Sequence, residues 1–303
     1  MLDRRGFTGL IGGGLLLGVG GMPLAAAGMR RENGDRQDAE RSAALNARIA
    51  RIEAESGGRL GVFLLDSGSG PRFGYRAREL FPMCSTFKFL LAAMILARVD
   101  RGKERLDRRI RFGPEAIVTY APITGKHVGG DGMSIAELCE ATMTLSDNVA
   151  ANLLLDTIGG PTALTAWLRT IGDKVTRLDR NEPSLNEARA GDPRDTTTPL
   201  AMLGNLRKLL IGRTLSAPSR ALLTSWMVGN RTGDRRLRAG LPSGWRVGDK
   251  TGTGENGTYN DIAIIWPPER PPLLMTAYLT QARPDRGDAT LAEVARAMAE
   301  LAG

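Results

Sequence analysis

A serine and a lysine stand three positions apart in the segment MCSTFKF, residues 83–89. Ser85 and Lys88 would share one face of a helix, because side chains at i and i+3 are neighbours there. A serine hydroxyl becomes a good nucleophile when a nearby group accepts its proton, and a buried lysine can do so because desolvation favours its neutral form. In the alternative reading Ser85 only caps a helix and Lys88 reaches solvent. The pair by itself leaves both readings open.

Two further short motifs carry hydroxyl, amide and ammonium groups. They are Ser146-Asp147-Asn148, ahead of an apolar helical run, and Lys250-Thr251-Gly252, followed by Thr253 at the end of a β-like run. Each motif alone also fits an ordinary role, as a helix cap or as a strand that enters a turn. The chain has one histidine, His127, so a Ser-His-Asp triad is not expected. A lysine-assisted serine is the nucleophile that the remaining residues favour.

In this order, the three motifs resemble the signature set of the penicillin-recognising serine enzymes. A fourth segment, RNEPSLN at residues 180–186, resembles the E-x-x-x-N pattern in the omega loop of the class A β-lactamases. The resemblance extends from about residue 40 to the C-terminus. It implies hydrolysis of the β-lactam amide of penicillins and cephalosporins through a serine acyl-enzyme, without a metal or another cofactor.

The resemblance also implies a role for individual residues. The catalytic set comprises the nucleophile Ser85, the base or proton relay Lys88, the proton donor Ser146, and Glu182, which activates the deacylating water. The substrate-binding set comprises Asn148, Asn186, Lys250, Thr251, Gly252, Thr253, Tyr120 and Arg236. Whether Lys88 or Glu182 accepts the proton during acylation stays open. Two further alternatives stay open. Arg236 could be a solvated arginine, since Arg235 and Arg238 are equally near, and Tyr120 could be a packing residue.

Other positions follow or depart from the family pattern. Arg180 and Asp195 match the ion pair across the neck of the omega loop, whereas Asn181 stands where many members have tryptophan. The usual disulfide partner of Cys139 would fall at Ala92, and the partner of Cys84 in the carbapenem-hydrolysing branch would fall at Gly254. Both thiols are therefore expected to be free and buried.

Periodicity predicts the elements that hold these residues. Apolar residues recur at helical spacing over 39–55, and 59–77 reads as a hairpin. The middle is helical, apart from a polar loop at 177–198, and the C-terminal part returns to strands before a final helix. We expect 28–40 to be loose. The predicted strands and final helix are 245–252, 259–268, 271–280 and 289–301.

Strands at both ends around a helical middle predict a discontinuous α/β fold. An α/β domain with an antiparallel sheet flanked by helices would comprise 28–83 and 229–303. An inserted all-α domain would comprise 84–228, including an omega loop at 177–195. The active site would lie between the two domains.

The N-terminus predicts export. Arg4, Arg5 and Phe7 precede a moderately apolar segment, and Ala25 and Ala27 form an A-x-A cleavage pattern. This arrangement is typical of a twin-arginine signal over 1–27 and a periplasmic protein. The alternative is an uncleaved anchor, which the glycines of the segment disfavour.

Composition fits a soluble globular protein, with 42% hydrophobic and 24% charged residues among 303. The net charge of +8 comes from scattered arginines without interleaved aromatics, so nucleic-acid binding is not expected. We expect a monomer that binds a small β-lactam. Two rival functions share the three motifs: a DD-peptidase, which has no need of Glu182 and Asn186, and a β-lactam sensor, which needs a tether and a signalling domain.

Overall fold

The computed structural model describes residues 24–68 and 72–302, and the chain divides into two units, Met1–Ala43 and Ala44–Gly303. Helix α1 spans Leu24–Ser56, so the expectation of a loose segment at 28–40 is wrong. This segment has no proline, and its three arginines and two glutamates are residues that favour a helix. Most of the predicted signal at 1–27 lies outside the described residues.

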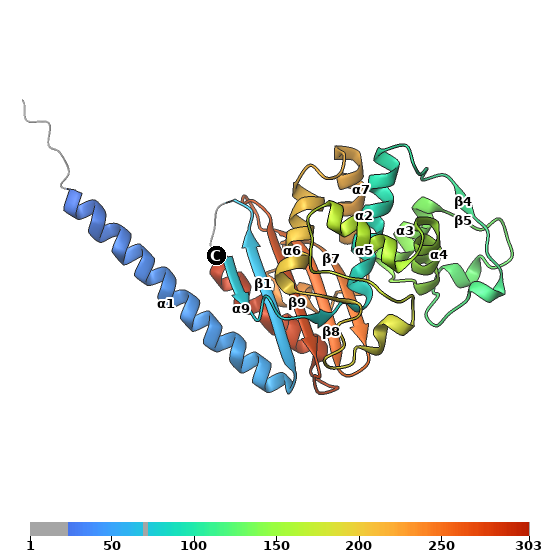
Figure 1. The fold of residues 1–303 in the computed structure, drawn as a ribbon. Helices are drawn as coiled ribbons and strands as arrows, with labels where there is room; N and C mark the ends of the chain where they lie inside the picture. The colour runs from blue at the N-terminus through green and yellow to red at the C-terminus, as the bar shows by residue number, and fades with distance from the viewer. Residues whose placement is uncertain (1–23, 69–71, 303) are drawn as a thin grey trace, which may run out of the picture. The chain divides into compact units, whose positions relative to one another are not determined.

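A five-stranded antiparallel sheet forms the centre of the second unit, in the order β2-β1-β9-β8-β7 (Figure 1). The predicted hairpin is present as the first two strands, and the three predicted C-terminal strands are also confirmed. The strands are β1 (Arg59–Asp66), β2 (Arg72–Tyr75), β7 (Arg246–Gly254), β8 (Thr258–Trp266) and β9 (Leu273–Thr280).

The two faces of the sheet belong to two separate hydrophobic cores. In β8, Ile262 and Ile264 pack in one core, whereas Ala263 and Ile265 pack in the other. This alternation follows from the period of two in a strand. A sheet that is covered on both faces needs apolar residues at successive positions, which explains the continuous apolar run DIAIIW.

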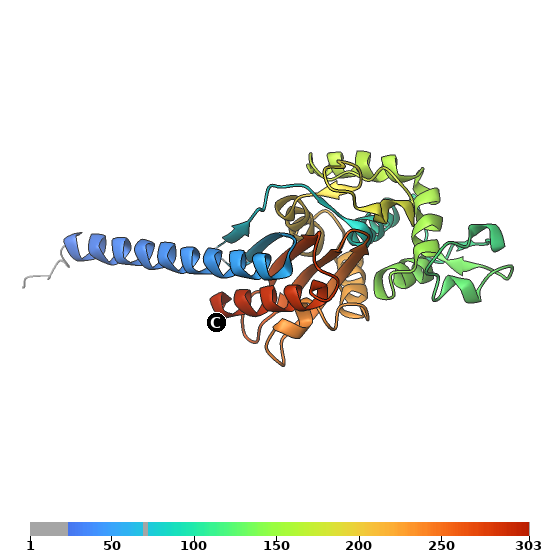
Figure 2. The same ribbon diagram turned by 90° about the horizontal axis from the view of Figure 1, so that it is seen from below.

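Helices cover both faces. The larger core joins one face to the helical middle of the chain, and the smaller core joins the other face to α8, α9 and the last turns of α1. Figure 2 shows α9 beside these last turns. The helices after α1 are α2 (Phe87–Asp100), α3 (Ile135–Thr144), α4 (Asn148–Ile158), α5 (Pro161–Thr170), α6 (Pro199–Leu206), α7 (Ala217–Val228), α8 (Leu237–Gly240) and α9 (Gly287–Ala302).

Short elements connect these parts. Strand β3 pairs with β6 and β4 pairs with β5, and neither ladder was predicted, because two-residue strands leave no periodic signal. The short strands are β3 (Phe81–Pro82), β4 (Arg109–Ile110), β5 (Met133–Ser134) and β6 (Thr196–Thr197). The short helical turns are η1 (Cys84–Thr86), η2 (Pro114–Ala116), η3 (Thr124–Lys126), η4 (Ser184–Glu187) and η5 (Arg207–Ile211).

The β3–β6 ladder fixes the segment that leads into η1 against the end of the polar loop, and the N–H of Met83 donates to the carbonyl of Asp195 at 2.8 Å. Residues 44–303 form one compact unit, and the predicted domain boundaries within it stay a prediction. In the described part of the chain, no helix has the length and apolarity to cross a membrane.

Candidate active site

Ser85 lies in the 3-10 turn η1, directly before α2. Cys84 has φ of 44°, in the left-handed region, and the turn packs against β7. The side-chain amide of Asn260 donates to the carbonyl of Met83 at 3.0 Å. A Cβ atom on Gly252 would lie 2.7 Å from the same carbonyl oxygen, so only glycine permits this approach. These contacts fix the position of the serine.

Lys88 is completely buried, so the alternative in which it reaches solvent is wrong. Its Nζ atom lies 3.0 Å from Oε1 of Glu182 and donates to Oδ1 of Asn148 at 2.6 Å and to the carbonyl of Ser146 at 2.7 Å. Burial lowers the pKa of Lys88, and the negative charge of Glu182 partly opposes this effect. Lys88, on α2, therefore connects the first motif to the Ser146-Asp147-Asn148 motif and to the loop that carries Glu182.

The hydroxyl of Ser85 donates to Oε1 of Glu182, at 3.2 Å. Within the described residues, no hydrogen bond joins Ser85 to Lys88, so the serine and the lysine meet through the glutamate. The i, i+3 spacing brings the two side chains to one site, but Glu182 is the nearest proton acceptor for the hydroxyl.

The second motif forms the start of α4. Ser146 has φ of 59°, in the left-handed region, and Asp147 caps the helix by accepting the N–H of Ala150 at 2.9 Å. The carboxylate of Asp147 also accepts from Thr124, whose hydroxyl is 2.8 Å away. The motif therefore has both expected roles: Asp147 caps the helix, and Ser146 and Asn148 contact the lysines of the site.

The third motif lies on β7, the edge strand of the sheet. Lys250 is completely buried, and its Nζ atom donates to Oγ of Ser146 at 3.0 Å. Burial lowers the pKa of Lys250 well below its usual range, and the nearby charge of Lys88 lowers it further. An anionic group in the site would raise this pKa again, because an opposite charge favours the ammonium form.

Glu182 is held at both ends of its side chain and along its backbone. Asn186 donates to Oε2 through Nδ2, at 2.5 Å, while Oδ1 of Asn186 is buried without a hydrogen-bond partner in the described chain. The amide of Asn152 donates to the carbonyl of Glu182 at 2.9 Å and accepts its N–H at 3.0 Å. Sequence reasoning missed Asn152, although an asparagine four residues after Asn148 in an otherwise apolar helix was a usable signal.

The expected ion pair across the loop is present. Nε of Arg180 lies 2.6 Å from Oδ2 of Asp195, and Oδ1 of the same carboxylate accepts the N–H groups of Asp179 and Arg180. Arg180 also pairs with Glu187 at 2.7 Å. Asp195 is 1% exposed, so its charge depends on these partners.

Replacing Arg180 by alanine should destabilise the protein by about 3 kcal/mol, because a buried carboxylate loses its counter-charge. The matched control is Arg177→Ala, which removes an ion pair with Asp179 whose arginine side chain is 45% exposed, and which should cost less than about 1 kcal/mol. Urea unfolding of both variants measures the difference. Equal and small losses in the two variants would show that the Arg180 pair does not stabilise the loop.

A cavity of about 370 Å³ opens above these groups. Eight residues of the predicted site line it, and Thr232, which sequence reasoning missed, joins them. The hydroxyls of Thr232 and Thr251 are hydrogen-bonded to each other. The lining consists of Ser85, Tyr120, Ser146, Asn148, Asn186, Thr232, Arg236, Thr251 and Thr253.

The other four predicted residues lie just outside this lining. Lys88, Glu182 and Lys250 are buried and connect to it through the hydrogen bonds given above, and Gly252 allows β7 to approach η1. Tyr120 is 54% exposed at the mouth of the cavity, and its carbonyl accepts the N–H of Asn148 at 3.0 Å.

Arg236 lines the cavity, whereas its two neighbours do not. Its NH2 group donates to the hydroxyl of Thr253 at 2.7 Å, and Nε pairs with Asp288 at 2.8 Å. Arg235 is mostly exposed, and Arg238 pairs with the buried Asp249. A solvated Arg236 is therefore wrong. Three basic side chains lie in or directly behind the lining of the polar cavity, Arg236, Lys88 and Lys250, and an anionic ligand would favour their charged forms.

Both cysteines are free and buried, as expected. A Cβ atom on Gly254 would lie 2.6 Å from Sγ of Cys84. The position of the second cysteine of the carbapenem-hydrolysing branch is therefore next to Cys84, but a glycine occupies it. Burial raises the pKa of both thiols, which disfavours the reactive thiolate.

A thiol reagent should consequently find no reactive thiol in the native protein and two in the denatured, unreduced protein. Titration with a chromogenic disulfide, with and without guanidinium chloride, measures both numbers. A count of zero after denaturation would demonstrate a disulfide.

Comparison with known proteins agrees with this geometry. The profile of the family described as "Beta-lactamase enzyme family" matches residues 44–301. Beta-lactamase OXY-2 of Klebsiella oxytoca is 47% identical over 242 residues, which cover 80% of this chain and 83% of that protein. The carbapenem-hydrolyzing beta-lactamase KPC, also of Klebsiella oxytoca, is 48% identical over 255 residues, which cover 84% of this chain and 86% of that protein.

Among solved structures, an ancestral class A beta-lactamase (GNCA) superposes with a TM-score of 0.83. It is 64% identical, and the match covers 84% of this chain and 99% of that one. At this identity and coverage the likeness extends to the sequence as well as the fold. The chain therefore belongs to the beta-lactamase enzyme family, as a class A serine enzyme.

Proposed function

We propose that the protein hydrolyses the β-lactam amide of penicillins and cephalosporins through an acyl-enzyme on Ser85 that a Glu182-activated water cleaves. The observation that carries this proposal is the shared carboxylate oxygen. Oε1 of Glu182 accepts the Ser85 hydroxyl at 3.2 Å and contacts Lys88 at 3.0 Å. A carboxylate in this position can accept a proton from the Ser85 hydroxyl during acylation and from water during deacylation.

In acylation, Oγ of Ser85 bonds to the lactam carbonyl carbon, and its proton passes to the Glu182–Lys88 pair. The lowered pKa of Lys88 supports its participation as a proton acceptor or relay. The backbone N–H groups of Ser85 and Thr253 would stabilise the oxyanion, and one such donor contributes about 3 kcal/mol.

Departure of the lactam nitrogen breaks the C–N bond, and the nitrogen takes a proton from Ser146. The hydroxyl of Ser146 lies 3.3 Å from Nζ of Lys88 and 3.0 Å from Nζ of Lys250, so either lysine can resupply that proton. A positioned proton donor of this kind contributes about 10²–10⁴-fold in rate.

In deacylation, Glu182 takes a proton from water as the water oxygen attacks the acyl carbon, and Ser85 leaves with a proton. The buried Oδ1 of Asn186, which has no hydrogen-bond partner among the described residues, offers that water an acceptor, while Nδ2 holds Glu182. This arrangement favours a hydrolase over a DD-peptidase or a sensor, which have no need of a clamped carboxylate beside the serine.

Substrate binding would use the cationic side of the cavity. Lys250, Thr251, Thr253 and Arg236 would hold the substrate carboxylate, with Thr232 behind Thr251. Asn148 would contact the side-chain amide of the substrate. One N–H of its Nδ2 is engaged by the carbonyl of Thr119 at 2.8 Å, and the other remains for this contact.

We also propose export by the twin-arginine route to the periplasm, which the sequence of 1–27 supports. Such export carries folded proteins, and the buried free thiols are compatible with it. We further propose that the mature protein is a monomer that binds neither nucleic acid nor membrane.

Steady-state kinetics on benzylpenicillin, an early cephalosporin and a carbapenem test the function and its range. The absence of the Cys84 bridge removes the feature typical of the carbapenem-hydrolysing branch, so we expect kcat/KM for the carbapenem to be at least about 10²-fold lower, the effect of a misplaced water. No turnover of the penicillin would contradict the proposed function. Rapid carbapenem turnover would contradict only the range.

A further inference from the structure

Two threonine hydroxyls in the lining of the active-site cavity, those of Thr232 and Thr251, are hydrogen-bonded to each other. Thr251 belongs to β7, whereas Thr232 lies in the segment between α7 and α8. A hydroxyl has one proton, so only one of the two can be the donor in this bond. The direction of the bond decides whether the proton of Thr251 points into the cavity or away from it.

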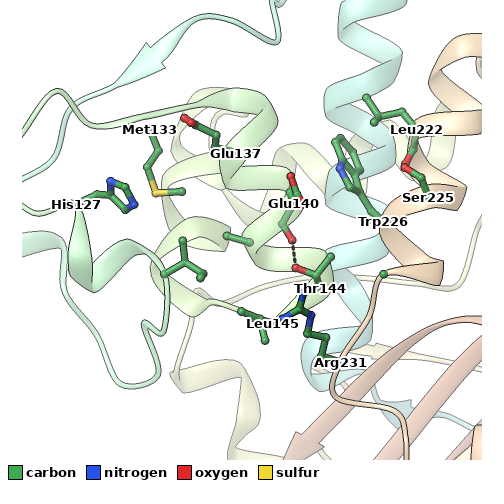
Figure 3. Close-up of a pocket in the computed structure, with 13 residues that line it drawn as sticks. His127, Met133, Glu137, Glu140, Thr144, Leu145, Leu222, Ser225, Trp226 and Arg231 are labelled. Carbon is green, nitrogen blue, oxygen red and sulfur yellow. Dashed lines mark hydrogen bonds between the residues drawn. The ribbon is translucent and has the colours of Figure 1, made fainter.

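The main chain at Thr232 is fixed by two hydrogen bonds. The N–H of the preceding residue, Arg231, donates to the carbonyl of Thr144 at 2.9 Å, and Figure 3 shows Arg231 beside Thr144 and Leu145 at the end of α3. The N–H of Thr232 itself donates to Oδ1 of Asn230 at 3.1 Å. These bonds fix the backbone from which the side chain of Thr232 reaches β7.

The side-chain amide of Asn230 has only one possible orientation. An N–H can only donate, so the amide atom that faces the N–H of Thr232 has to be the oxygen, Oδ1. The other end of the amide, Nδ2, donates to the buried carboxylate of Asp249 at 2.5 Å. A flipped amide would place its NH2 group against the N–H of Thr232, with donors facing each other.

The direction of the bond between the two hydroxyls follows from this orientation. Oδ1 of Asn230 can only accept, and it lies 2.8 Å from the hydroxyl of Thr232, which therefore donates to it. Because Thr232 has no second proton, Thr251 is the donor in the bond between the hydroxyls. The proton of Thr251 is thus directed away from the cavity, and its oxygen presents only lone pairs to a ligand.

The hydroxyl of Thr253 has the opposite arrangement. It accepts a hydrogen bond from NH2 of Arg236 at 2.7 Å, and none of the described residues accepts its proton in turn. This proton is available to a ligand in the cavity. Of the two threonines proposed to hold the substrate carboxylate, Thr251 and Thr253, only the second is therefore ready to donate.

We propose that Thr232 is a positioning residue that weakens the binding of the substrate carboxylate, because it keeps the proton of Thr251 engaged. To donate to the carboxylate, Thr251 has to turn its proton into the cavity, and either its bond to Thr232 or the bond from Thr232 to Asn230 is then lost. The net contribution of one neutral hydrogen bond corresponds to about threefold to tenfold in affinity. This inference rests on the proposed binding of the substrate carboxylate at Thr251.

Weaker binding of this group is compatible with fast turnover. The carboxylate is present in the substrate, the acyl-enzyme and the product, so a bond to it stabilises these states alike and does not raise kcat. The hydrolysed lactam keeps the same carboxylate and leaves more readily when Thr251 does not donate to it. We infer that Thr232 trades affinity for the substrate against release of the product.

Binding of benzylpenicillin to a Ser85→Ala protein tests the inference, because this protein cannot form the acyl-enzyme. Calorimetric titration measures the dissociation constant in Ser85→Ala alone and with Thr232→Val or Thr232→Ser added. We expect Thr232→Val to lower the dissociation constant about threefold to tenfold, and Thr232→Ser, which keeps the hydroxyl, to leave it unchanged. General damage to the site would weaken binding, so it cannot imitate this result. An unchanged or higher dissociation constant in Thr232→Val would overturn the proposal.

The methyl ester of benzylpenicillin is the matched ligand, because it has the same ring system without the negative charge. An ester oxygen is a weaker acceptor than a carboxylate oxygen, so the dissociation constant of the ester should change less than twofold on Thr232→Val. An equal gain for the ester and the acid would show that Thr232→Val acts through the shape of the cavity, which would contradict a role of the Thr251 proton.

Thr251→Val removes the hydroxyl on which the inference depends. In a Ser85→Ala, Thr251→Val protein, the further change Thr232→Val should leave the affinity for benzylpenicillin as it was, since the two side chains act as one unit. A gain that persists without the Thr251 hydroxyl would overturn the proposal. If Ser85→Ala itself binds no benzylpenicillin, the proposed function fails and this inference fails with it, whereas binding without a gain in Thr232→Val refutes the inference alone.

Discussion

Glu182→Gln should acylate on Ser85 and then stall. The amide keeps the size of the side chain and its contact with Asn186, but it cannot take a proton from water. Loss of general-base catalysis should lower kcat by about 10²–10⁴-fold. A stopped-flow trace with a chromogenic cephalosporin should show a burst of one equivalent, followed by a slow steady state.

The matched control for this variant is Glu187→Gln, on the same loop. Its carboxylate pairs with Arg180 and Arg189 and does not line the active-site cavity, so kcat should stay within a few fold of wild type. Turnover of Glu182→Gln at a near wild-type rate would show that another group activates the water. A missing burst would show that Glu182 is also indispensable for acylation.

Lys88→Met should slow acylation by about 10²–10⁴-fold, because the proton path between Ser85, Glu182 and Ser146 loses its central group. Methionine fills the space of the buried lysine stem but offers no donor to Glu182 or Asn148. The rate constant for acylation, measured by stopped flow as a function of substrate concentration, is the direct readout.

Lys103→Met is the matched control, because Lys103 is exposed in the turn after α2. Its acylation rate should equal that of wild type. Circular dichroism and urea unfolding of Lys88→Met separate a catalytic loss from misfolding. A folded Lys88→Met enzyme that acylates within tenfold of wild type would contradict the role of the lysine.

The strands and the three motifs were predictable because their signals are local. The apolar runs of β8 and β9 and the glycine after Lys250-Thr251 can be read from neighbouring residues. The failure at 28–40 has the opposite cause: that segment is polar all round, and hydrophobic periodicity cannot detect a helix without an apolar face.

The direct contact between Ser85 and Glu182 was not predictable, because the two residues are 97 positions apart and their distance depends on how the loop folds. The same limit applies to Asn152, Thr232 and Asn260, which orient the predicted residues from other elements. Spacing identifies which groups share a helix face, but not which oxygen a hydroxyl on another element will reach.

Mass spectrometry of Glu182→Gln after brief exposure to benzylpenicillin tests the central claim most directly. The intact protein should gain the mass of one penicillin, and peptide mapping should place that mass on Ser85, with a lifetime much longer than in wild type. An adduct on another residue, or an adduct on Ser85 that disappears as fast as in wild type, would contradict a Ser85 acyl-enzyme that Glu182 resolves.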